Sequence, residues 1–534
     1  MPEERFDYII VGGGSAGCVL ANRLSASGKH RVCLLEAGPS DRTPFITIPG
    51  AFAYFMFSRK YNWAFDSEPV ADIREGQSIF CPQGKGLGGS SSINAMIYIR
   101  GHRLDYDHWA SLGNHGWGWN DLLPYFKLNE CNERGADELH GGSGPLFVSN
   151  CRNYYPINEL FLKAAGETGF SLNDDFNGPQ QEGVGLYQFT IRDGKRCSAS
   201  RAYLRPAMSR EILTVKCNAL ASRILFEGKK AVGIEYRQKG ALKRIYADRE
   251  VIVSAGAYNS PKLLMLSGIG GRASLEGAGI TPFHELPGVG ENLQEHVDSC
   301  VLQASRKSDG FSTSVGGLLK MWREPFRYLL GKKGKLESSI TQAGAFLRTS
   351  EDLEAPDIQL HFLPLLYDDS GRNLKLMSQN GYSCHVCVLR PKSRGRMTLR
   401  SSDPAAPPRI DLNFFDHPDD GKTMANGIRI ARRILAAPSF NDRRGAELSP
   451  GSELQSDEEI LARCKKTLGL VYHPVGTCKM GSDDMAVVDE SLKVHGLESL
   501  RVVDASIMPT LIGGNTNAPT MVIAEKAADL ILQI

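Results

Sequence analysis

A glycine-rich turn between two short apolar runs, close to the start of the chain, constrains the fold more than any other feature. The runs cover residues 6–11 and 31–35, and Gly12, Gly14 and Gly17 stand between them with Gly-x-Gly-x-x-Gly spacing. Apolar residues at helical spacing follow the glycines, and an acidic residue ends the second run. Strand, glycine loop, helix, strand and acid in this order form the βαβ fingerprint of a dinucleotide-binding site.

The residue types in this fingerprint follow from what a dinucleotide needs. Gly12 allows a tight turn, Gly14 lets backbone N–H groups approach a pyrophosphate, and Gly17 lets the helix pack close to the strand. The helix N-terminus carries a partial positive charge that suits phosphate. Glu36 can accept hydrogen bonds from both hydroxyls of a ribose and would repel a 2′-phosphate, which disfavours NADP. The fingerprint alone does not separate FAD from NAD, and a glycine turn without a ligand is the alternative.

Length and charge narrow the class of protein. A chain of 534 residues should hold at least two domains, because single domains usually have about 100–200 residues. The formal net charge of +2 gives no reason to expect a nucleic-acid partner. No segment has the roughly 20 consecutive apolar residues of a membrane span. Because the first strand begins at residue 6, we expect no signal peptide and a cytoplasmic protein.

The cysteines give no sign of a metal or redox centre. Cys384 and Cys387 form a Cys-x-x-Cys pair, but they lie in an alternating run, residues 382–389, that is typical of a strand. Side chains three positions apart on a strand point to opposite faces. We therefore expect buried thiols here, and no metal site in the chain.

A second glycine-rich segment lies at residues 84–92, where four glycines and three serines precede an apolar run that we expect to be helical. A glycine loop at the start of a helix is again suited to bind an anion. A nicotinamide enzyme needs only one such loop. FAD, whose pyrophosphate and isoalloxazine ring both need support, could use two.

At this point the sequence resembles a known family. Residues 84–107 resemble the first signature of the glucose–methanol–choline (GMC) oxidoreductases, and residues 256–270 resemble the second. Together with the N-terminal fingerprint and blocks near the C-terminus, the resemblance covers the whole chain. Within the family, the chain is similar to the bacterial FAD-linked dehydrogenases of aliphatic alcohols, polyethylene glycol and choline.

The resemblance implies an α/β protein, α+β overall, in which a discontinuous Rossmann-like FAD-binding domain has an inserted substrate-binding domain built on an antiparallel sheet. We expect residues 1–150, 196–300 and 466–534 to form the FAD-binding domain, and residues 151–195 and 301–465 to form the substrate-binding domain. Residues 356–362, 398–400 and 410–412 read as strands of that one antiparallel sheet.

The resemblance also indicates where the chemistry takes place. The family's active-site histidine lies in a His-Pro-x-Gly-Thr motif, which here is His473, and a second His or Asn precedes the last helix, here Asn517. Oxidation of an alcohol removes a hydride, which flavin N5 accepts, and a hydroxyl proton, which a histidine can accept near neutral pH. Asn517 would orient the substrate oxygen, with a helix-capping role as the alternative. His296, in a further family block, is expected to be structural.

The family pattern further implies a set of residues around the flavin. Members with covalently attached flavin carry His at the position of Asn94, so we expect non-covalent FAD. The implied FAD-binding residues are Gly12, Gly14, Ser15, Ala16, Gly17, Glu36, Gly86, Gly88, Ser90, Asn94, Ala95, Met96, Ile97, Ala221, Ala255, Asp504, Ala505, Asn515, Thr516, Ala518 and Thr520.

The sequence therefore predicts an FAD-dependent dehydrogenase that converts a non-sugar primary alcohol into an aldehyde and passes electrons to a quinone or another carrier. The first alternative is an oxidase that uses O2 on an aliphatic, choline-like or aryl alcohol. A flavin-binding protein without catalysis and a nicotinamide-linked enzyme are the others.

One segment, residues 318–335, stands apart because it is basic and amphipathic. Its apolar residues at helical spacing are Leu318, Trp322, Phe326, Leu329 and Leu330, and its basic residues are Lys320, Arg323, Arg327, Lys332, Lys333 and Lys335. We favour a lid helix with its apolar face packed on the protein. The alternative is peripheral contact with the inner face of the cell membrane, which would suit an enzyme that reduces a membrane quinone.

Overall fold

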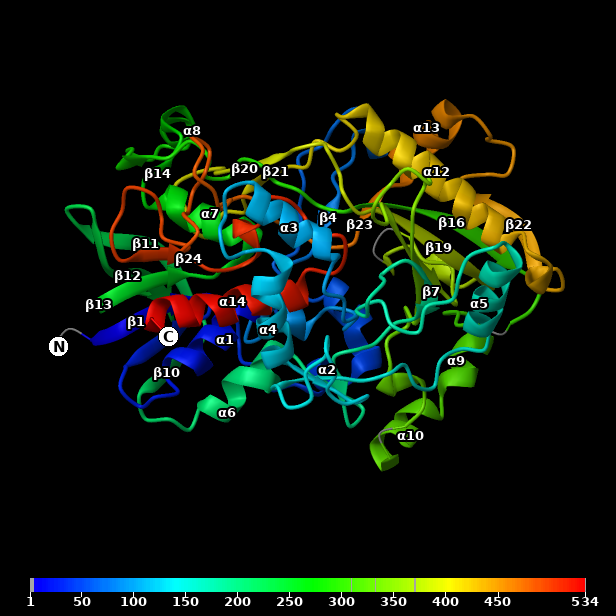
Figure 1. Ribbon diagram of the computed structural model, residues 1–534, viewed down its shortest axis with the longest axis horizontal. Coiled ribbons are helices and arrows are strands. Elements are labelled where there is room, and N and C mark those ends of the chain that lie inside the picture. Colours follow the sequence, from blue (N-terminus) through cyan, green and yellow to red (C-terminus); the bar gives the residue numbers. More distant parts are fainter. Residues whose placement is uncertain (1–3, 309, 332, 369–370, 534) are drawn as a thin grey trace.

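Two seven-stranded sheets, placed next to each other along the long axis of the molecule, organise the chain (Figure 1). The structure is a computed structural model that describes residues 4–308, 310–331, 333–368 and 371–533. The first sheet carries the N-terminal fingerprint and lies on the left in Figure 1, and the second sheet lies on the right.

The first sheet is the nucleotide sheet predicted by the fingerprint. Its order is β10-β2-β1-β13-β12-β11, with β24 also paired to β13. The strands are β1 (Arg5–Val11), β2 (Val32–Leu35), β10 (Leu213–Lys216), β11 (Ala219–Glu227), β12 (Lys230–Gln238), β13 (Ala241–Val253) and β24 (Leu500–Val502). All pairings are parallel except those of β12, which is antiparallel to both β11 and β13. Because its strands come from the start, middle and end of the chain, the predicted discontinuous Rossmann-like fold is confirmed.

The second sheet is antiparallel throughout, with the order β22-β16-β19-β18-β17-β7 and β23 paired to β16. Its strands are β7 (Gly183–Leu186), β16 (Val297–Ser305), β17 (Ala343–Leu347), β18 (Ile358–Leu363), β19 (Gly381–Val388), β22 (Arg444–Ser449) and β23 (Gly469–Leu470). Alternate residues such as Val301, Leu360 and Val386 form an apolar core, which helices α5 (Ile157–Glu167) and α12 (Pro418–Leu435) cover. This confirms an inserted region built on an antiparallel sheet.

The detailed domain boundaries stay a prediction. Strand β16 runs across the boundary placed at residue 300, and β23 belongs to the second sheet although it lies within residues 466–534. Cys384 and Cys387 are both buried on β19, and they belong to two different apolar clusters on opposite faces of the strand, as the alternation predicted.

Two local expectations were wrong. The runs near residues 398 and 410 form β20 (Arg396–Thr398) and β21 (Arg409–Asp411), which pair with each other as an isolated hairpin and not with β18. Each run is only three residues long, and three prolines in the connecting loop cannot donate to a ladder. After the second glycine loop, only Gly89–Ser92 is helical, as a 3-10 turn. An α-helix cannot continue there because Met96 has a positive φ of 64°.

The amphipathic segment also differs from the favoured expectation. It forms α9 (Val315–Met321) and α10 (Glu324–Gly331), at the lower right edge of Figure 1. Its apolar residues Leu318, Trp322, Phe326, Leu329 and Leu330 are 54–90% exposed. The buried face of α10 instead carries Glu324 and Tyr328, and the Tyr328 hydroxyl donates to the carbonyl of Gly194 (2.8 Å). The prediction of a lid helix with its apolar face packed on the protein is therefore wrong, because two polar side chains one turn apart anchor the opposite face of α10.

The side chain of Lys320 and the whole of Lys332 lie outside the described residues. Among the residues that are described, no helix combines the length and hydrophobicity that a bilayer-spanning segment requires.

Candidate active site

The two glycine loops form one cradle at the N-terminus of α1 (Ser15–Leu24). The N–H of Gly88 in the second loop donates to the carbonyl of Gly13 in the first (2.7 Å). A Cβ on Gly89 would lie 2.7 Å from the Cα of Gly14, so no larger residue fits at this crossing. The close approach leaves backbone N–H groups and the positive end of α1 facing the same space, which suits a pyrophosphate.

Glu36 connects the two glycine loops of this cradle through hydrogen bonds to backbone N–H groups. One carboxylate oxygen accepts the N–H of Gly13 (2.8 Å), and the other accepts those of Gly38 (2.7 Å) and Gly86 (2.9 Å). Burial raises the pKa of Glu36, and the three N–H groups oppose that rise. Because a carboxylate has about four acceptor sites, Glu36 has room for one ribose hydroxyl, whereas the sequence predicted two.

A long cavity runs from this cradle to the inner face of the second sheet. Most residues predicted to bind the cofactor line it: Gly12, Gly14, Ser15, Ala16, Glu36, Ser90, Asn94, Ala95, Met96, Ile97, Ala221, Ala255, Asp504, Ala505, Asn515, Thr516 and Thr520. Gly17, Gly86, Gly88 and Ala518 are not among the residues that line it. The glycine cradle has space that larger side chains would fill, and it continues into a cavity lined by both polar and apolar residues. This arrangement fits the pyrophosphate and the ring system of FAD.

His473 lies in the cavity wall, where a strained turn presents it. The preceding residue, Tyr472, has a φ of 68°, which is costly for a bulky side chain. This turn directs the N–H of His473 to a carboxylate oxygen of Glu295 (2.6 Å), which also accepts the N–H of His296 (2.8 Å). Burial raises the pKa of Glu295 to about 8. One buried carboxyl group thus holds the two histidines next to each other.

The hydrogen bonds of His296 determine which nitrogen of His473 carries hydrogen. Nε2 of His296 lies 3.0 Å from the carbonyl of Leu389, and a carbonyl can only accept, so this nitrogen carries hydrogen. Burial lowers the pKa of His296 to about 4, so its Nδ1 is a bare acceptor at neutral pH. Nδ1 of His473, 2.9 Å away, must therefore be the donor.

The opposite nitrogen of His473, Nε2, is consequently unprotonated. Burial, with smaller effects from His296 and His361, holds the pKa of His473 well below its ordinary value. The imidazole thus stays neutral and directs a lone pair away from His296. Its neighbour there is Asn515, whose Nδ2 lies 3.1 Å from Nε2.

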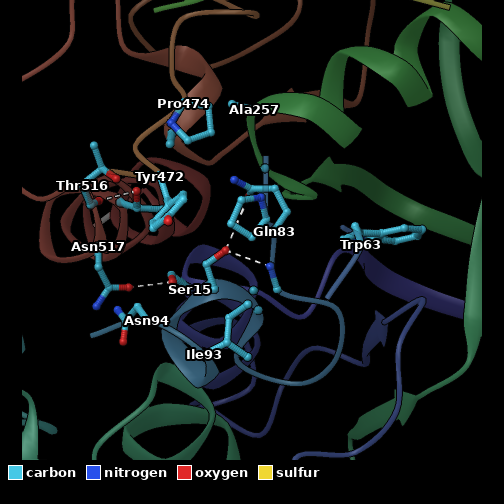
Figure 2. A pocket seen from close by; sticks show the side chains of 18 of the residues that line it. Ser15, Trp63, Gln83, Ile93, Asn94, Ala257, Tyr472, Pro474, Thr516 and Asn517 are labelled. Atoms are coloured by element: carbon cyan, nitrogen blue, oxygen red, sulfur yellow. Dashed lines mark hydrogen bonds between the residues drawn. The ribbon is translucent and has the colours of Figure 1, made fainter. Parts of the chain in front are cut away.

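The structure separates the roles of the two asparagines near the last helix, α14 (Asn517–Leu532). Asn517 lines the cavity, and its side-chain oxygen accepts the Ser15 hydroxyl (2.8 Å), as Figure 2 shows. Asn515, expected only beside the flavin, is the one in contact with His473. Asn517 therefore has its acceptor engaged and offers amide N–H groups to the cavity.

Sequence reasoning missed several cavity residues. Asp298, His361 and His385 project from the second sheet into the cavity, and Trp63 and Tyr472 add aromatic surface. The signal for the first three was present, because each is a polar residue inside a short apolar strand. Which strands would meet, and which face would be turned to the cavity, could not be read locally.

Comparisons with known proteins identify the family to which the chain belongs. The GMC oxidoreductase family model matches residues 6–298 with its N-terminal part and residues 391–524 with its C-terminal part. The chain is 47% identical over 535 residues to an alcohol dehydrogenase [acceptor] of Pseudomonas putida, covering 99% of this chain and 96% of that protein. It is 44% identical over 531 residues to an oxygen-dependent choline dehydrogenase of Photobacterium profundum, covering 99% and 93%.

A solved structure supports the fold and the cofactor. Aspergillus oryzae formate oxidase, studied for modification of its FAD, superposes with a TM-score of 0.91 at 27% identity, covering 100% of this chain and 99% of the other. The chain belongs to the GMC oxidoreductase family. It is an FAD-dependent enzyme that oxidises alcohols, as the sequence predicted.

Proposed function

We propose that this enzyme converts a primary, non-sugar alcohol into an aldehyde, with His473 as the base. The observation that supports this most directly is the chain of hydrogen bonds from Leu389 through His296 to His473, which leaves Nε2 of His473 unprotonated beside the cavity. Because the pKa of His473 is low, its Nε2 is unprotonated at neutral pH and is available there as the acceptor of a hydroxyl proton.

In the proposed reaction, the alcohol hydroxyl replaces Asn515 as the hydrogen-bonding partner of His473 Nε2. The amide N–H groups of Asn515 and Asn517 donate to the alcohol oxygen and stabilise its developing negative charge. The hydroxyl proton moves to Nε2 as the carbonyl bond forms. Bound FAD, held non-covalently by the predicted residues of the cradle and by Asn94, supplies the acceptor for the hydride that leaves the carbon. A purely structural role for the protein would not need this arrangement of a base and two donors.

The test is anaerobic reduction of the flavin by medium-chain alcohols, followed at the flavin absorbance. We expect His473→Ala to lower the reduction rate by at least about 100-fold, the usual effect of removing an acid–base group, while FAD stays bound. His115→Ala, which removes an exposed histidine, is the matched control and should leave the rate unchanged. Reduction of the His473 variant at the wild-type rate would refute the assignment.

For the electrons, we propose a quinone or another carrier as acceptor, with O2 as the alternative. Admission of air after anaerobic reduction distinguishes the two. Slow return of the oxidised spectrum, accelerated by a soluble quinone, supports the dehydrogenase, and rapid return in air alone supports the oxidase.

We further propose that α9 and α10 place the enzyme on the cytoplasmic face of the membrane. The apolar side chains of Trp322, Phe326, Leu329 and Leu330 face outward, and the exposed Arg323 lies next to them in the sequence. Apolar surface combined with positive charge is the combination that binds an anionic lipid surface. Such contact would hold the enzyme at the membrane in which a quinone acceptor is dissolved.

Liposome flotation at low salt tests this contact. Wild-type protein should float with anionic vesicles, and Leu329→Asp with Leu330→Asp should abolish flotation. Leu242→Asp, at an exposed leucine of β13, is the control and should still float. Wild-type protein that stays at the bottom of the gradient would contradict the proposal.

A further inference from the structure

Arg196 is a buried arginine that the proposed reaction does not use. It ends strand β9 (Lys195–Arg196), which pairs with β8 (Ile191–Arg192) in a short hairpin. Its side chain is buried, with the whole residue only 1% exposed, although an arginine in a protein stays charged at neutral pH. A buried charge is costly unless a partner compensates it, so the partners of this guanidinium are informative.

Arg196 donates its hydrogen bonds to uncharged oxygens. Nε donates to the carbonyl of Ile46 (3.0 Å). Nη1 donates to the carbonyls of Ser91 (3.2 Å) and Asn94 (2.7 Å) and to the side-chain oxygen of Asn94 (2.8 Å). Nη2 is buried and has no hydrogen-bond partner among the residues that the structure describes. The guanidinium therefore holds the end of the second glycine loop without receiving a negative charge in return.

The positive charge of Arg196 is not neutralised by an ion pair. Arg100, which is also fully buried, shows the usual arrangement, because it forms an ion pair with Glu130 (2.5 Å). No carboxylate in the described part of the chain makes such a contact with Arg196, and burial lowers its pKa to about 9. This pKa is still above neutral pH, so a positive charge remains inside the protein.

Arg196 also determines how the side chain of Asn94 is oriented. The side-chain oxygen of Asn94 accepts hydrogen bonds from Nη1 of Arg196 and from the N–H of Met96 (3.1 Å). Both of these groups can only donate, so the amide oxygen must face them and the amide nitrogen must point elsewhere. Asn94 lies in the wall of the cavity, as Figure 2 shows. The amide N–H groups of Asn94 are therefore available on the cavity side.

From this geometry we propose that Arg196 is a positioning residue for flavin reduction. It directs the amide N–H groups of Asn94 to the cavity, and it keeps an uncompensated positive charge one hydrogen bond behind them. The hydride that leaves an alcohol carries two electrons and one negative charge to the oxidised flavin. A positive charge in a buried wall stabilises this added charge, because the protein interior screens it less than water does. Arg196 thus raises the reduction potential of the bound flavin.

The midpoint potential of the bound flavin tests this role, measured by anaerobic titration with dithionite against a reference dye. Arg196→Gln keeps an N–H donor for Asn94 but removes the charge. We expect the equilibrium constant for flavin reduction to fall at least about tenfold, which lowers the potential of a two-electron couple by about 30 mV. Between two unit charges about 10 Å apart, an effective dielectric constant of about 20 gives an effect of this size.

Arg192→Gln is the matched control on the same hairpin. It removes an equal charge from a side chain that is 60% exposed. Water and salt screen a charge in that position, so the potential should equal that of the wild type. A fall as large as that in Arg196→Gln would show that the potential responds to the net charge of the protein, and it would overturn the role of the buried guanidinium.

A second variant separates the charge from the hydrogen bonds. Arg196→Met removes both, and its potential should fall at least as far as that of Arg196→Gln. A wild-type potential in Arg196→Gln would overturn the proposal, even if that of Arg196→Met is low. Loss of FAD from both variants would also overturn it, because Arg196 would then only hold the loop together. Since dithionite replaces the alcohol, these outcomes do not depend on the proposed substrate or on His473 as the base.

Discussion

Replacing His296 tests whether this buried histidine sets the protonation of His473, the proposed base. His296 is fully buried between the carbonyl of Leu389 and His473. In His296→Leu, Nδ1 of His473 loses its acceptor, and the imidazole is free to turn or to carry its hydrogen on Nε2. In His296→Gln, the side-chain amide can still accept from His473 and donate to Leu389. The two variants therefore differ in the hydrogen bond while both remove the second imidazole.

The size of the effect follows from the hydrogen bond that is lost. A neutral hydrogen bond contributes about 0.5–1.5 kcal/mol net, so the productive arrangement should become about 2- to 13-fold less populated, since 1.36 kcal/mol corresponds to a factor of ten. The rate of anaerobic flavin reduction should fall by that factor in His296→Leu. It should recover most of the loss in His296→Gln.

Stopped-flow absorbance at saturating alcohol measures this rate, with the flavin content of each variant determined beforehand. A His296→Leu rate equal to that of the wild type would show that His473 keeps its tautomer without help. A loss as large as that of His473→Ala, with FAD still bound, would show that His296 itself takes part in proton transfer. Either result would refute the positioning role.

Two further predictions concern stability and the cradle. Burial lowers the pKa of His361 to about 3, so this residue stays neutral in the folded protein, whereas in the unfolded chain it takes up a proton below pH 6.5. The free energy of unfolding of the wild type therefore falls as the pH is lowered. The variant His361→Gln should remove about 1.4 kcal/mol of that fall between pH 7.5 and 5.5, as measured by urea unfolding. An identical pH dependence in the variant would contradict this. Gly89→Ala should push the glycine loops apart and weaken FAD binding at least about tenfold by titration, because its Cβ would overlap backbone atoms of the other loop. Gly28→Ala, which has a positive φ but open space around it, should bind FAD as the wild type does.

The sequence predicted those parts of the structure whose signals are local. The strand, glycine loop, helix and acid of the N-terminal fingerprint lie within 36 residues, and each is determined by its own backbone requirements. The local sequence could not show whether Asn515 or Asn517 lies next to His473. The two residues are separated by one position at the start of α14, and the start of that helix decides which side chain faces His473.

The amphipathic segment shows a different limit. Periodicity correctly grouped Trp322, Phe326 and Leu329 on one face, but it cannot say whether that face is turned toward the protein or away from it. The decision came from Glu324 and Tyr328 on the other face, whose hydrogen-bonding partners are distant in sequence. Similarly, Asp298 and His385 become a pair only because β16 and β19 are neighbours in the sheet.

The way the nucleotide sheet is assembled has a consequence for synthesis on the ribosome. Its fingerprint is made first, but β24 comes from residues 500–502, and α1 packs against α14 at the very end of the chain. Arg23 on α1 forms ion pairs with Glu525 and Asp529 on α14. The half that binds the cofactor therefore cannot be completed until nearly the whole chain has been translated. Until then, the apolar strands near the N-terminus stay exposed, because β24 and α14 have not yet been made.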